Sequence, residues 1–568
     1  MQTGFSPREN SLLERVRQRL SGIYGIEDTY QVVMPRLLQL LRLYRQATPE
    51  AHKERWDQHD CFLITYGDSL HQPDQAPLAS LQQFLGRHLK AVISTIHILP
   101  FFPYSSDDGF SVIDYRLVKP DLGEWDDIAQ IGKDFDLMMD LVLNHISRKS
   151  LWFHDFKSGL EPYNNYFIEV SPDEDLSQVV RPRPHPLLVE VLTHQEVKHL
   201  WATFSVDQID LNYKCPQVFL EFVDILMRYY AMGARVVRLD AVAFLWKELG
   251  TPCIHLPQTH ELIKAFRDLF ELIDPEGLIL TETNVPHEEN VSYFGQGDEA
   301  HLVYQFALPP LLLHAFWSGK GQYLSSWAKD LKAPPEGCSF MNFTASHDGI
   351  GLRGAEGILP LEERDLLLAA MRSRGGFVSM RSVGEAMEPY EINIAYYSAL
   401  AEDHEGHPEL QRERFMASQA AMLSFKGIPA IYFNSMVATE NDMLGVELTG
   451  RTRSINRKKW LLPELESLLA DPQSPQAQVF EGLKRLLAVR KQQPAFHPDG
   501  EQEVWDLGSS FLALLRRAPQ SDQVLLALIN LTPHPQAWPE FSGEWDDLLG
   551  SAPGAALKPY QVCWLVRR

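Results

Sequence analysis

The stretch Ala234-Arg-Val-Val-Arg-Leu-Asp240 decides the fold, because it is a short, largely apolar run that ends in a carboxylate. Parallel strands covered on both faces have sequences of this kind, since neither face meets water. From about residue 60 onward the chain contains eight such runs, which is the number that a (β/α)8 TIM barrel requires. They are Cys61–Tyr66, Ala91–Leu99, Leu137–Leu143, Ala234–Leu239, Leu278–Thr281, Leu302–Phe306, Phe340–Thr344 and Ala430–Phe433.

The spacing of the runs indicates one insertion in the barrel, and a stretch rich in Gly and charged residues indicates a second. Asp240 and Glu282 are 42 residues apart, about one strand, one helix and the return, whereas Asp140 and Asp240 are 100 residues apart. We therefore expect an inserted lobe after the third strand and a second inserted loop region after the seventh. The predicted ranges are 58–145 and 206–493 for the barrel, 146–205 for the first lobe and 349–406 for the second region.

The two ends of the chain have patterns that differ from the barrel. Leu13, Val16 and Leu20 have the three- and four-residue spacing of one helix face, so residues 1–57 are predicted to form a helical extension. After about residue 494 the pattern changes to short β-like runs separated by Pro and Gly turns. This pattern predicts an antiparallel β domain at 494–568.

The 568-residue chain is acidic, with 52 Lys and Arg against 75 Asp and Glu and a formal charge of −23. Because no local basic patch stands out, neither nucleic acid nor an acidic membrane is an expected partner. The five cysteines are scattered without metal-ligand spacing, so neither a disulfide framework nor a metal site is predicted. The first ten residues lack the apolar stretch of a signal peptide, and we expect a cytoplasmic protein.

Polar side chains follow four of the predicted strands. They lie in Asp140–His145, Arg238–Ala241, Thr281–Thr283 and Ser346–Asp348. The carboxyl ends of barrel strands converge on one mouth, so carboxylates that are remote in sequence become neighbours there. One such Asp alone is more often a helix cap or an ion-pair partner, but paired carboxylates suit cleavage of a glycosidic bond. Arg238 is expected to keep Asp240 ionised and to pair with Asp140.

These segments resemble the conserved regions of the α-amylase family, glycoside hydrolase family 13. From about Phe62 to Trp460 the chain is similar to the sucrose phosphorylase branch of that family, most specifically in the phrases Phe306–His314 and His347–Gly351. Within the branch, the helical extension and several motifs most resemble glucosylglycerol and glucosylglycerate phosphorylases. Those motifs are Phe244–Lys247, Thr281–His287 and Phe343–His347.

The resemblance implies a retaining α-glucosyl phosphorylase, which reversibly converts a small α-glucoside and phosphate into α-glucose 1-phosphate and the free acceptor. It implies Asp240 as nucleophile, Glu282 as general acid/base and Asp348 as stabiliser of the transition state. It implies a glucose pocket made of Asp107, His145, Gln208, Arg238, His347 and Arg457. It implies that phosphate and acceptor bind at Arg183, Tyr390 and Glu391. No metal or organic cofactor is implied.

The segment Ser379–Glu388 bears on the choice of acceptor, because it lacks the Lys/Asn…Pro-Asp-Gly pattern of the relatives that act on glucosylglycerate. Glu385 and Glu388 add negative charge near the expected acceptor. Unless Arg353 or Arg381 compensates, this charge disfavours an anionic leaving group. The first choice from the sequence is therefore the neutral glucoside 2-O-α-glucosylglycerol.

Several other functions stay open at this point. Glucosylglycerate, sucrose and sucrose 6'-phosphate are alternative substrates for a phosphorylase. An α-glucoside hydrolase or transglucosidase on the same scaffold is a further alternative. A non-catalytic binding subunit is disfavoured, because Asp240, Glu282 and Asp348 are all present.

Overall fold

The computed structural model describes residues 5–45, 55–383, 386–401, 408–550 and 556–568. Within these ranges, eight parallel strands close into a barrel, and each strand overlaps one of the predicted runs. The (β/α)8 prediction is confirmed. Around the ring the strands are β1 (Phe62–Thr65), β3 (Thr95–Ile98), β4 (Asp136–Val142), β9 (Ala234–Asp240), β10 (Leu278–Thr281), β11 (Leu302–Tyr304), β12 (Ser339–Asn342) and β16 (Ile428–Tyr432).

The strand register places the polar residues at the carboxyl ends of β4, β9 and β10 at the same height in the barrel. All seven residues of β9 are buried, as expected for a strand with helices on one side and the barrel core on the other. Asp240 pairs in register with Val142 of β4, and Leu239 pairs with Thr281 of β10. The residue after β10 is Glu282, whose amide donates to the carbonyl of Leu239 at 3.1 Å. Asp240 and Glu282 therefore leave adjacent strands side by side.

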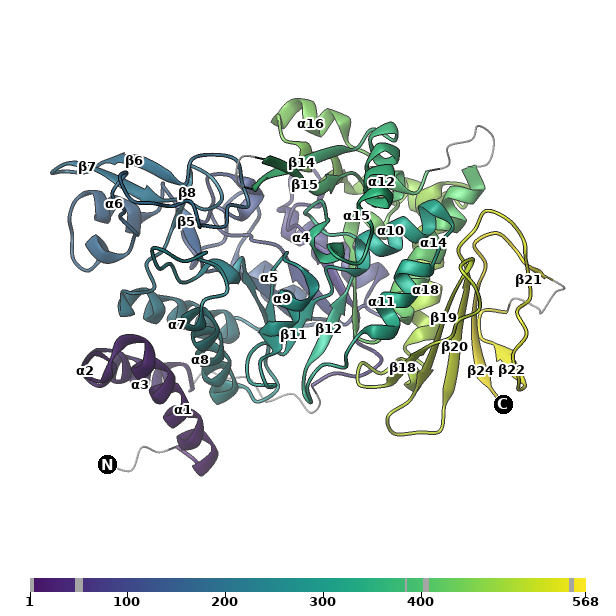
Figure 1. Ribbon diagram of the computed structural model, residues 1–568, viewed down its shortest axis with the longest axis horizontal. Helices are drawn as coiled ribbons and strands as arrows, with labels where there is room; N and C mark the ends of the chain where they lie inside the picture. Colours follow the sequence, from purple (N-terminus) through teal and green to yellow (C-terminus); the bar gives the residue numbers. More distant parts are fainter. Residues whose placement is uncertain (1–4, 46–54, 384–385, 402–407, 551–555) are drawn as a thin grey trace.

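Helices cover the outside of the barrel (Figure 1). Several begin with Pro in the first turn, where a missing amide hydrogen costs no helical hydrogen bond. The main covering helices are α4 (Pro77–His88), α5 (Trp125–Ile131), α7 (Pro216–Ala231), α8 (Pro257–Ile273), α10 (Leu308–Ser318), α11 (Gln322–Asp330), α14 (Pro408–Ser424), α17 (Leu462–Ala470) and α18 (Pro475–Arg490).

The N-terminal segment is helical and packs against α8. It contains α1 (Pro7–Tyr24), α2 (Ile26–Asp28), the π-helical turn η1 (Thr29–Val33) and α3 (Met34–Arg45). Val16 and Leu20 are fully buried. Beside them, Arg19 donates to Asp268 of α8 at 3.2 Å and to Glu261 at 3.0 Å. The segment, purple in Figure 1, covers the outer face of the barrel helices rather than the mouth.

Two inserted regions lie on the same side of the barrel, along the upper edge of Figure 1. The first contains β5 (His145–Ser147), α6 (Leu151–Lys157), β6 (Leu188–Leu192), β7 (Val197–Trp201) and β8 (Gln208–Asp210). The second is a three-stranded antiparallel sheet with a helix, made of β13 (Ile350–Gly351), α12 (Leu361–Ser373), β14 (Phe377–Val383) and β15 (Ala386–Asn393). Smaller elements, α16 (Met443–Thr449) and η7 (Thr452–Asn456), complete this side.

The C-terminal strands form a separate antiparallel sheet, as expected. Its order is β18 (Glu501–Val504), β19 (Phe511–Arg517), β20 (Val524–Asn530), β24 (Val562–Arg567) and β22 (Trp545–Asp547). Two hydrogen bonds connect this sheet to helix α14 of the barrel. Trp564 donates to the hydroxyl of Ser424 and Arg516 donates to its carbonyl, each at 3.0 Å. A two-stranded sheet, β21 (Gln536–Ala537) with β23 (Ala556–Leu557), lies at the far end in Figure 1.

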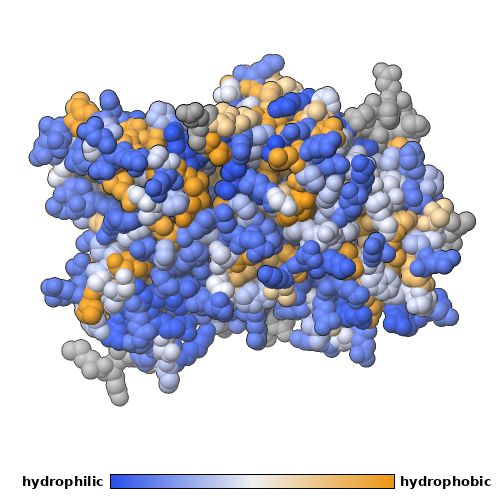
Figure 2. All heavy atoms as spheres, viewed as in Figure 1, coloured by the Kyte–Doolittle hydropathy of each residue, from blue (hydrophilic) through white to orange (hydrophobic). Residues whose placement is uncertain are grey.

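The five cysteines are all buried and unpaired. Within the described ranges, no helix has the length and hydropathy to cross a bilayer, and no group of three or more His, Cys, Asp or Glu is placed to hold a metal ion. The face in Figure 2 is mainly hydrophilic, with hydrophobic side chains gathered around its upper centre.

Candidate active site

One buried guanidinium connects the two carboxyl groups at the ends of β9 and β10. Arg238 Nη1 donates to Asp240 Oδ1 at 2.7 Å, and its Nη2 lies 3.9 Å from Glu282 Oε2. The amide of Ala241 donates to the same Glu282 oxygen at 3.1 Å. Ala241 has a φ of 50°, a strained left-handed conformation that turns this amide toward Glu282. Two acids from adjacent strands thus face one cation.

Arg238 is itself fixed from behind. It donates to Asp140 of β4, which also accepts a 2.6 Å hydrogen bond from His97 Nε2. All three side chains are 0–2% exposed, so the guanidinium has no alternative partner in water. The expected pairing of Asp140 with Arg238 is present. Removing either partner of such a pair would leave an uncompensated buried charge.

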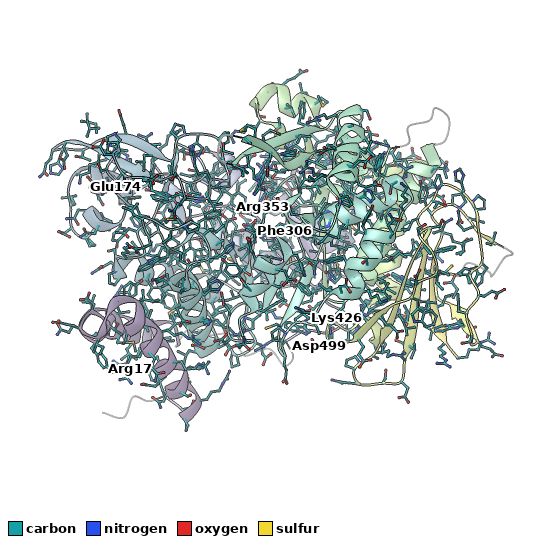
Figure 3. The ribbon with its side chains drawn as sticks, viewed as in Figure 1. Arg17, Glu174, Phe306, Arg353, Lys426 and Asp499 are labelled. Carbon is teal, nitrogen blue, oxygen red and sulfur yellow. The ribbon has the colours of Figure 1, made fainter. Side chains whose placement is uncertain are left out.

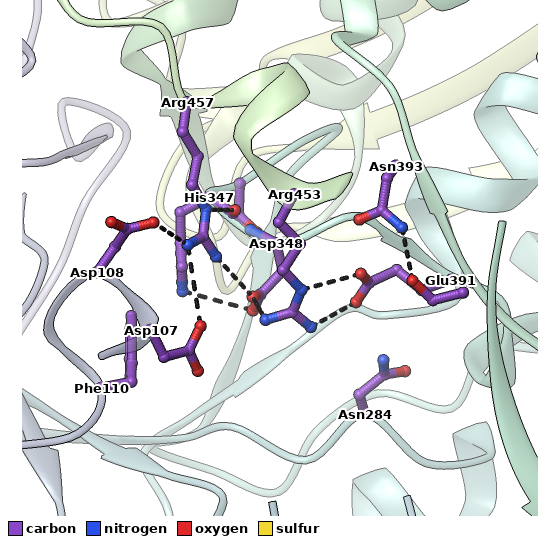
Figure 4. A network of polar contacts seen from close by, with 12 residues as sticks. Asp107, Asp108, Phe110, Asn284, His347, Asp348, Glu391, Asn393, Arg453 and Arg457 are labelled. Carbon is purple, nitrogen blue, oxygen red and sulfur yellow. Dashed lines mark hydrogen bonds and ion pairs between the residues drawn. The ribbon is translucent and has the colours of Figure 1, made fainter. Parts of the chain in front are cut away.

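A second arginine organises the third carboxylate, Asp348, which follows β12 (Figure 4). Arg453 Nη1 lies 2.5 Å from Asp348 Oδ1. The same guanidinium donates to both oxygens of the buried Glu391, at 3.0 and 2.6 Å. His347 Nε2 is 3.4 Å from Asp348 on its other side. Arg453 therefore holds Asp348 and Glu391 together through one planar group.

Arg457 forms the neighbouring part of this network. Its Nη1 donates to Asp108 at 2.6 Å, while Asp107 is farther away at 3.9 Å. Asp107 and Asp108 have φ values of 55° and 48°, and Gly109 follows at 117°. A Cβ at Gly109 would stand 2.5 Å from the carbonyl oxygen of Pro100, so only glycine fits this turn. Strain of this kind is common where a loop holds side chains for a ligand.

Aromatic and neutral polar groups form the floor of the site. The rings of His347 and Phe110 stack with centroids 4.8 Å apart and planes 3° apart. His145 contacts the carbonyl of Phe110 at 2.9 Å, and Gln208 lies 3.2 Å from His145. The antiparallel pairing of β5 with β8 brings His145 and Gln208 together, although they are far apart in sequence. A flat apolar face edged by polar groups suits a sugar ring.

Burial and neighbouring charges shift the pKa of each of the three carboxyl groups. Burial, assisted by Asp240 and Asp348, raises the pKa of Glu282 to about 7. Burial also raises the pKa of Asp240, but Arg238 and His145 oppose that rise. At Asp348, burial is outweighed by Arg453 and its neighbours, so the pKa lies well below its ordinary value. Glu282 is thus the group suited to exchange a proton near neutral pH.

Two cavities meet at Glu282 and Tyr390. The first, which we call the catalytic cavity, is lined by Asp240, Glu282, Asp348 and the aromatic floor. The second has a volume of about 310 Å³ and extends from Glu282 away from Asp240 and Asp348, between the two inserted regions. Arg183 lines the catalytic cavity with its guanidinium 5.5 Å from the centre of the Tyr390 ring. Among the described residues Arg183 makes no hydrogen bond or ion pair, so its donors are available to a ligand.

The chain is similar to several known carbohydrate-active enzymes. Residues 88–339 match the model of the α-amylase catalytic domain. A glucosylglycerate phosphorylase of Spirochaeta thermophila is 49% identical over 92% of this chain and 89% of that protein. One from Escherichia coli is 41% identical over 97% of this chain and 100% of that protein. A glucosylglycerol phosphorylase of Marinobacter adhaerens is 30% identical over 80% of this chain and 91% of that protein.

The chain belongs to the sucrose phosphorylase branch of glycoside hydrolase family 13. It is accordingly an enzyme, a glycosyltransferase of the phosphorylase type. A solved member, the sucrose 6F-phosphate phosphorylase of Thermoanaerobacter thermosaccharolyticum, superposes with a TM-score of 0.73 at 26% identity, over 84% of this chain and 94% of that one. The resemblance noted from motifs is confirmed.

The structure brings the predicted site residues of this family 13 enzyme into one place. The lining of the catalytic cavity includes Asp107, Arg183, His145, Gln208, Asp240, Glu282, His347, Asp348, Tyr390 and Glu391. Arg238 and Arg457 do not line it but lie directly behind it, bonded to Asp240 and to Asp108. Both oxygens of Glu391 accept a hydrogen bond from Arg453.

Sequence reasoning missed Arg453 and Asp108. Arg453 stands immediately before the phrase Ser454-Ile-Asn-Arg457 and one helical turn before Arg457. That i, i+4 spacing of two cations was the available signal. Asp108, and not the predicted Asp107, makes the hydrogen bond to Arg457, and the sequence does not reveal which carboxylate of an adjacent pair turns toward the arginine.

The raised pKa of Glu282 predicts the pH dependence of a reaction in which this group donates a proton. Above pH about 7 the carboxyl is ionised in the free enzyme, so kcat/KM should fall about tenfold for each further pH unit. Steady-state kinetics across this range measures the effect. The Glu282→Gln variant should have no such falling limb, and a wild-type profile that stays level through this range would contradict the prediction.

Proposed function

We propose that this protein catalyses the reversible phosphorolysis of an α-glucosylglycerate, giving α-glucose 1-phosphate and glycerate with retention of configuration. The observation that carries the proposal is the shared contact of Asp240 and Glu282 with Arg238: Asp240 accepts a hydrogen bond from the guanidinium, and burial raises the pKa of the more distant Glu282 to about 7. A retaining glucosyl transfer requires two neighbouring carboxyl groups, one that attacks the sugar and one that exchanges a proton.

In the first step, Asp240 attacks the anomeric carbon while Glu282 gives its proton to the departing glycosidic oxygen. The product is a β-glucosyl ester of Asp240 and a free hydroxyl on the acceptor. Asp348, kept ionised by Arg453, stabilises the positive charge that develops on the sugar ring. Burial lowers the pKa of His347 to about 3, so this ring contributes a neutral donor against the sugar rather than a second cation.

In the second step, phosphate attacks the same carbon from the side on which the acceptor departed, returning a proton to the ionised Glu282, and the Asp240 ester bond breaks. Phosphate must therefore occupy space beside Glu282. Arg183 and Tyr390 lie there, with the hydroxyl of Tyr390 accepting a hydrogen bond from Asn284 at 3.2 Å. We assign phosphate to these two residues. Glu391 positions Arg453 instead of contacting phosphate.

Phosphorolysis also requires that water be kept from the ester intermediate, because hydrolysis would compete with phosphate. The first inserted region supplies Val179–Pro182 and the second supplies Arg381–Val383 to the wall beside Glu282. Segments of two separate lobes thus line the site and limit the access of water. This enclosure favours a phosphorylase over the hydrolase or transglucosidase alternative.

The proposed acceptor, glycerate, differs from glycerol, which the sequence favours. Glucosylglycerol has less support than glucosylglycerate, because three relatives named for glucosylglycerate are 41–49% identical and a relative named for glucosylglycerol is 30% identical. The negative charge of Glu385 and Glu388, which counted against an anionic acceptor, also has less weight in the structure. Glu388 forms a 3.0 Å ion pair with Arg381, and Glu385 lies outside the described residues.

A panel of glucosides tests this assignment. We expect glucosylglycerate to be phosphorolysed with a kcat/KM about 100-fold above that of glucosylglycerol, since a buried hydrogen bond to a charged group changes binding by about 1.5–3 kcal/mol. Sucrose and sucrose 6'-phosphate should be poorer still. α-Glucose 1-phosphate, identified by NMR, is the measured product. A preference for sucrose, or glucose release independent of phosphate, would refute the proposal.

The two acids can be distinguished by the leaving group. Glu282→Gln should lower kcat/KM on a glucoside by about 10²–10⁴-fold but spare α-glucosyl fluoride, because fluoride leaves without a proton. Asp240→Asn should abolish turnover of both, with an unchanged circular dichroism spectrum as the control for folding. An Asp240→Asn variant that stays folded and active would remove Asp240 from the role of nucleophile.

Substitution of Arg183 should change the KM for phosphate rather than the reaction with the glucoside. Arg183→Ala is expected to raise the KM for phosphate by about 10- to 100-fold, the cost of a lost charge-assisted hydrogen bond. The burst of acceptor released before phosphate is added should change little. Arg183→Lys serves as the matched control, because it keeps the charge and should recover part of the loss. An unchanged phosphate KM in the Ala variant would assign phosphate elsewhere.

A further inference from the structure

The cavity of about 310 Å³ beside Glu282 is lined by three arginines, Arg181, Arg353 and Arg381. We call it the arginine cavity. Glu282 is the one carboxylic acid among its described lining residues, and that acid is largely protonated below pH 7. The cavity therefore carries positive charge, in a chain whose formal charge is −23. Such local reversal of charge marks a binding site for an anion.

Arg353 is placed by a tight backbone contact. It begins the turn η6 (Arg353–Ala355) just after β13, and the next residue is Gly354. A Cβ on Gly354 would stand 2.4 Å from backbone atoms of Phe306, so the turn lies directly against that residue. Figure 3 shows Arg353 and Phe306 next to each other at the centre of the molecule. The guanidinium is thus held at the barrel mouth and is 13% exposed.

Arg381 reaches the same cavity from β14. Its Nη2 bonds to Glu356 at 2.9 Å and to Glu388, the residue opposite it on β15, at 3.0 Å. Both glutamates point outward, with 37% and 45% of their side chains exposed, and neither lines the cavity. They contact the guanidinium of Arg381 from the solvent side, so its other edge faces the cavity.

The two guanidiniums have donors without acceptors. The Nε atoms of Arg353 and Arg381 are buried and make no hydrogen bond in the structure. The carboxylate of Glu356 is 3.7 Å from the Nε of Arg353, too far for a hydrogen bond. The side chain of Arg353 makes no hydrogen bond to any described residue. Buried donors in this state are satisfied by a ligand or by water.

We propose that Arg353 and Arg381 bind the carboxylate of the acceptor and make the enzyme selective for 2-hydroxy carboxylates over neutral polyols. This inference rests on the proposed function. In such an acceptor the carboxylate carbon is two bonds from the glycosidic oxygen that Glu282 protonates, so the carboxylate must enter the cavity beside Glu282. Planar guanidinium groups fit a carboxylate with paired hydrogen bonds.

Inorganic phosphate is the other anion that Arg353 and Arg381 could bind. Kinetic measurements distinguish phosphate binding from binding of the acceptor carboxylate. In the synthetic direction, α-glucose 1-phosphate is supplied with D-glycerate or with glycerol. For Arg353→Met and Arg381→Met we expect the ratio of kcat/KM for glycerate to that for glycerol to fall by about 100-fold. The KM for phosphate in phosphorolysis should rise far less than this ratio falls. Arg372→Met, an exposed arginine on α12, is the matched control and should leave both unchanged.

Titration calorimetry with D-glycerate alone makes the test independent of turnover. Binding to the folded wild type and its loss in both Met variants, with an unaltered melting temperature, would support the proposal. A glycerate preference that survives both substitutions would overturn it, while the proposed function would stand. A phosphate KM that rises as steeply as the glycerate ratio falls would overturn it in favour of a phosphate site.

The remaining outcomes separate this inference from the proposed function. If the wild type binds glycerate through the two arginines but phosphorolyses a different glucoside, the proposed function fails and the carboxylate site stands. If the wild type neither binds glycerate nor transfers glucose to it, both fail. Arg353→Lys, which keeps the charge but not the planar fork, should recover only part of the selectivity.

Discussion

The buried guanidinium of Arg238 is the group on which the geometry of the site depends. It contacts Asp140 behind it, Asp240 beside it and Glu282 on the next strand, and it is 2% exposed. A cation in that position can be tolerated only with carboxylates around it, and the carboxylates can be buried only with the cation present. The barrel register places all four groups within reach, so strand pairing and site chemistry are parts of one constraint.

Arginines also divide the site into regions of different charge. Arg453 fixes Asp348 and Glu391 on the sugar side, whereas Arg353 and Arg381 face the opposite side of Glu282. Glu282 lies between these regions with a pKa near neutrality, because burial acts on it more strongly than the more distant contact with Arg238 does. The result is an acid that can give and take a proton between a sugar pocket and an anion pocket.

The sequence predicted the barrel well because each barrel strand is a local signal. A strand buried on both faces must be apolar along its length, and this can be read without knowing its neighbours. The carboxylates at the strand ends followed for the same reason, since a polar residue ending an apolar run stands out. Loop residues were harder to predict. Arg453, Asp108 and the occupied state of Glu391 depend on which side chains meet across loops, and no local pattern records this.

The charge around the acceptor also depends on contacts between loops that the sequence does not record. Counting Glu385 and Glu388 along the sequence suggested a negative mouth, but Glu388 turns outward to Arg381, and three arginines from two insertions converge inside. The sequence by itself determined the barrel, the order of its acidic strand ends and the family, because these depend on local hydrophobic periodicity and short motifs. Only the tertiary structure decided the charge facing the acceptor, because that charge is the sum of side chains brought together by chain segments remote in sequence.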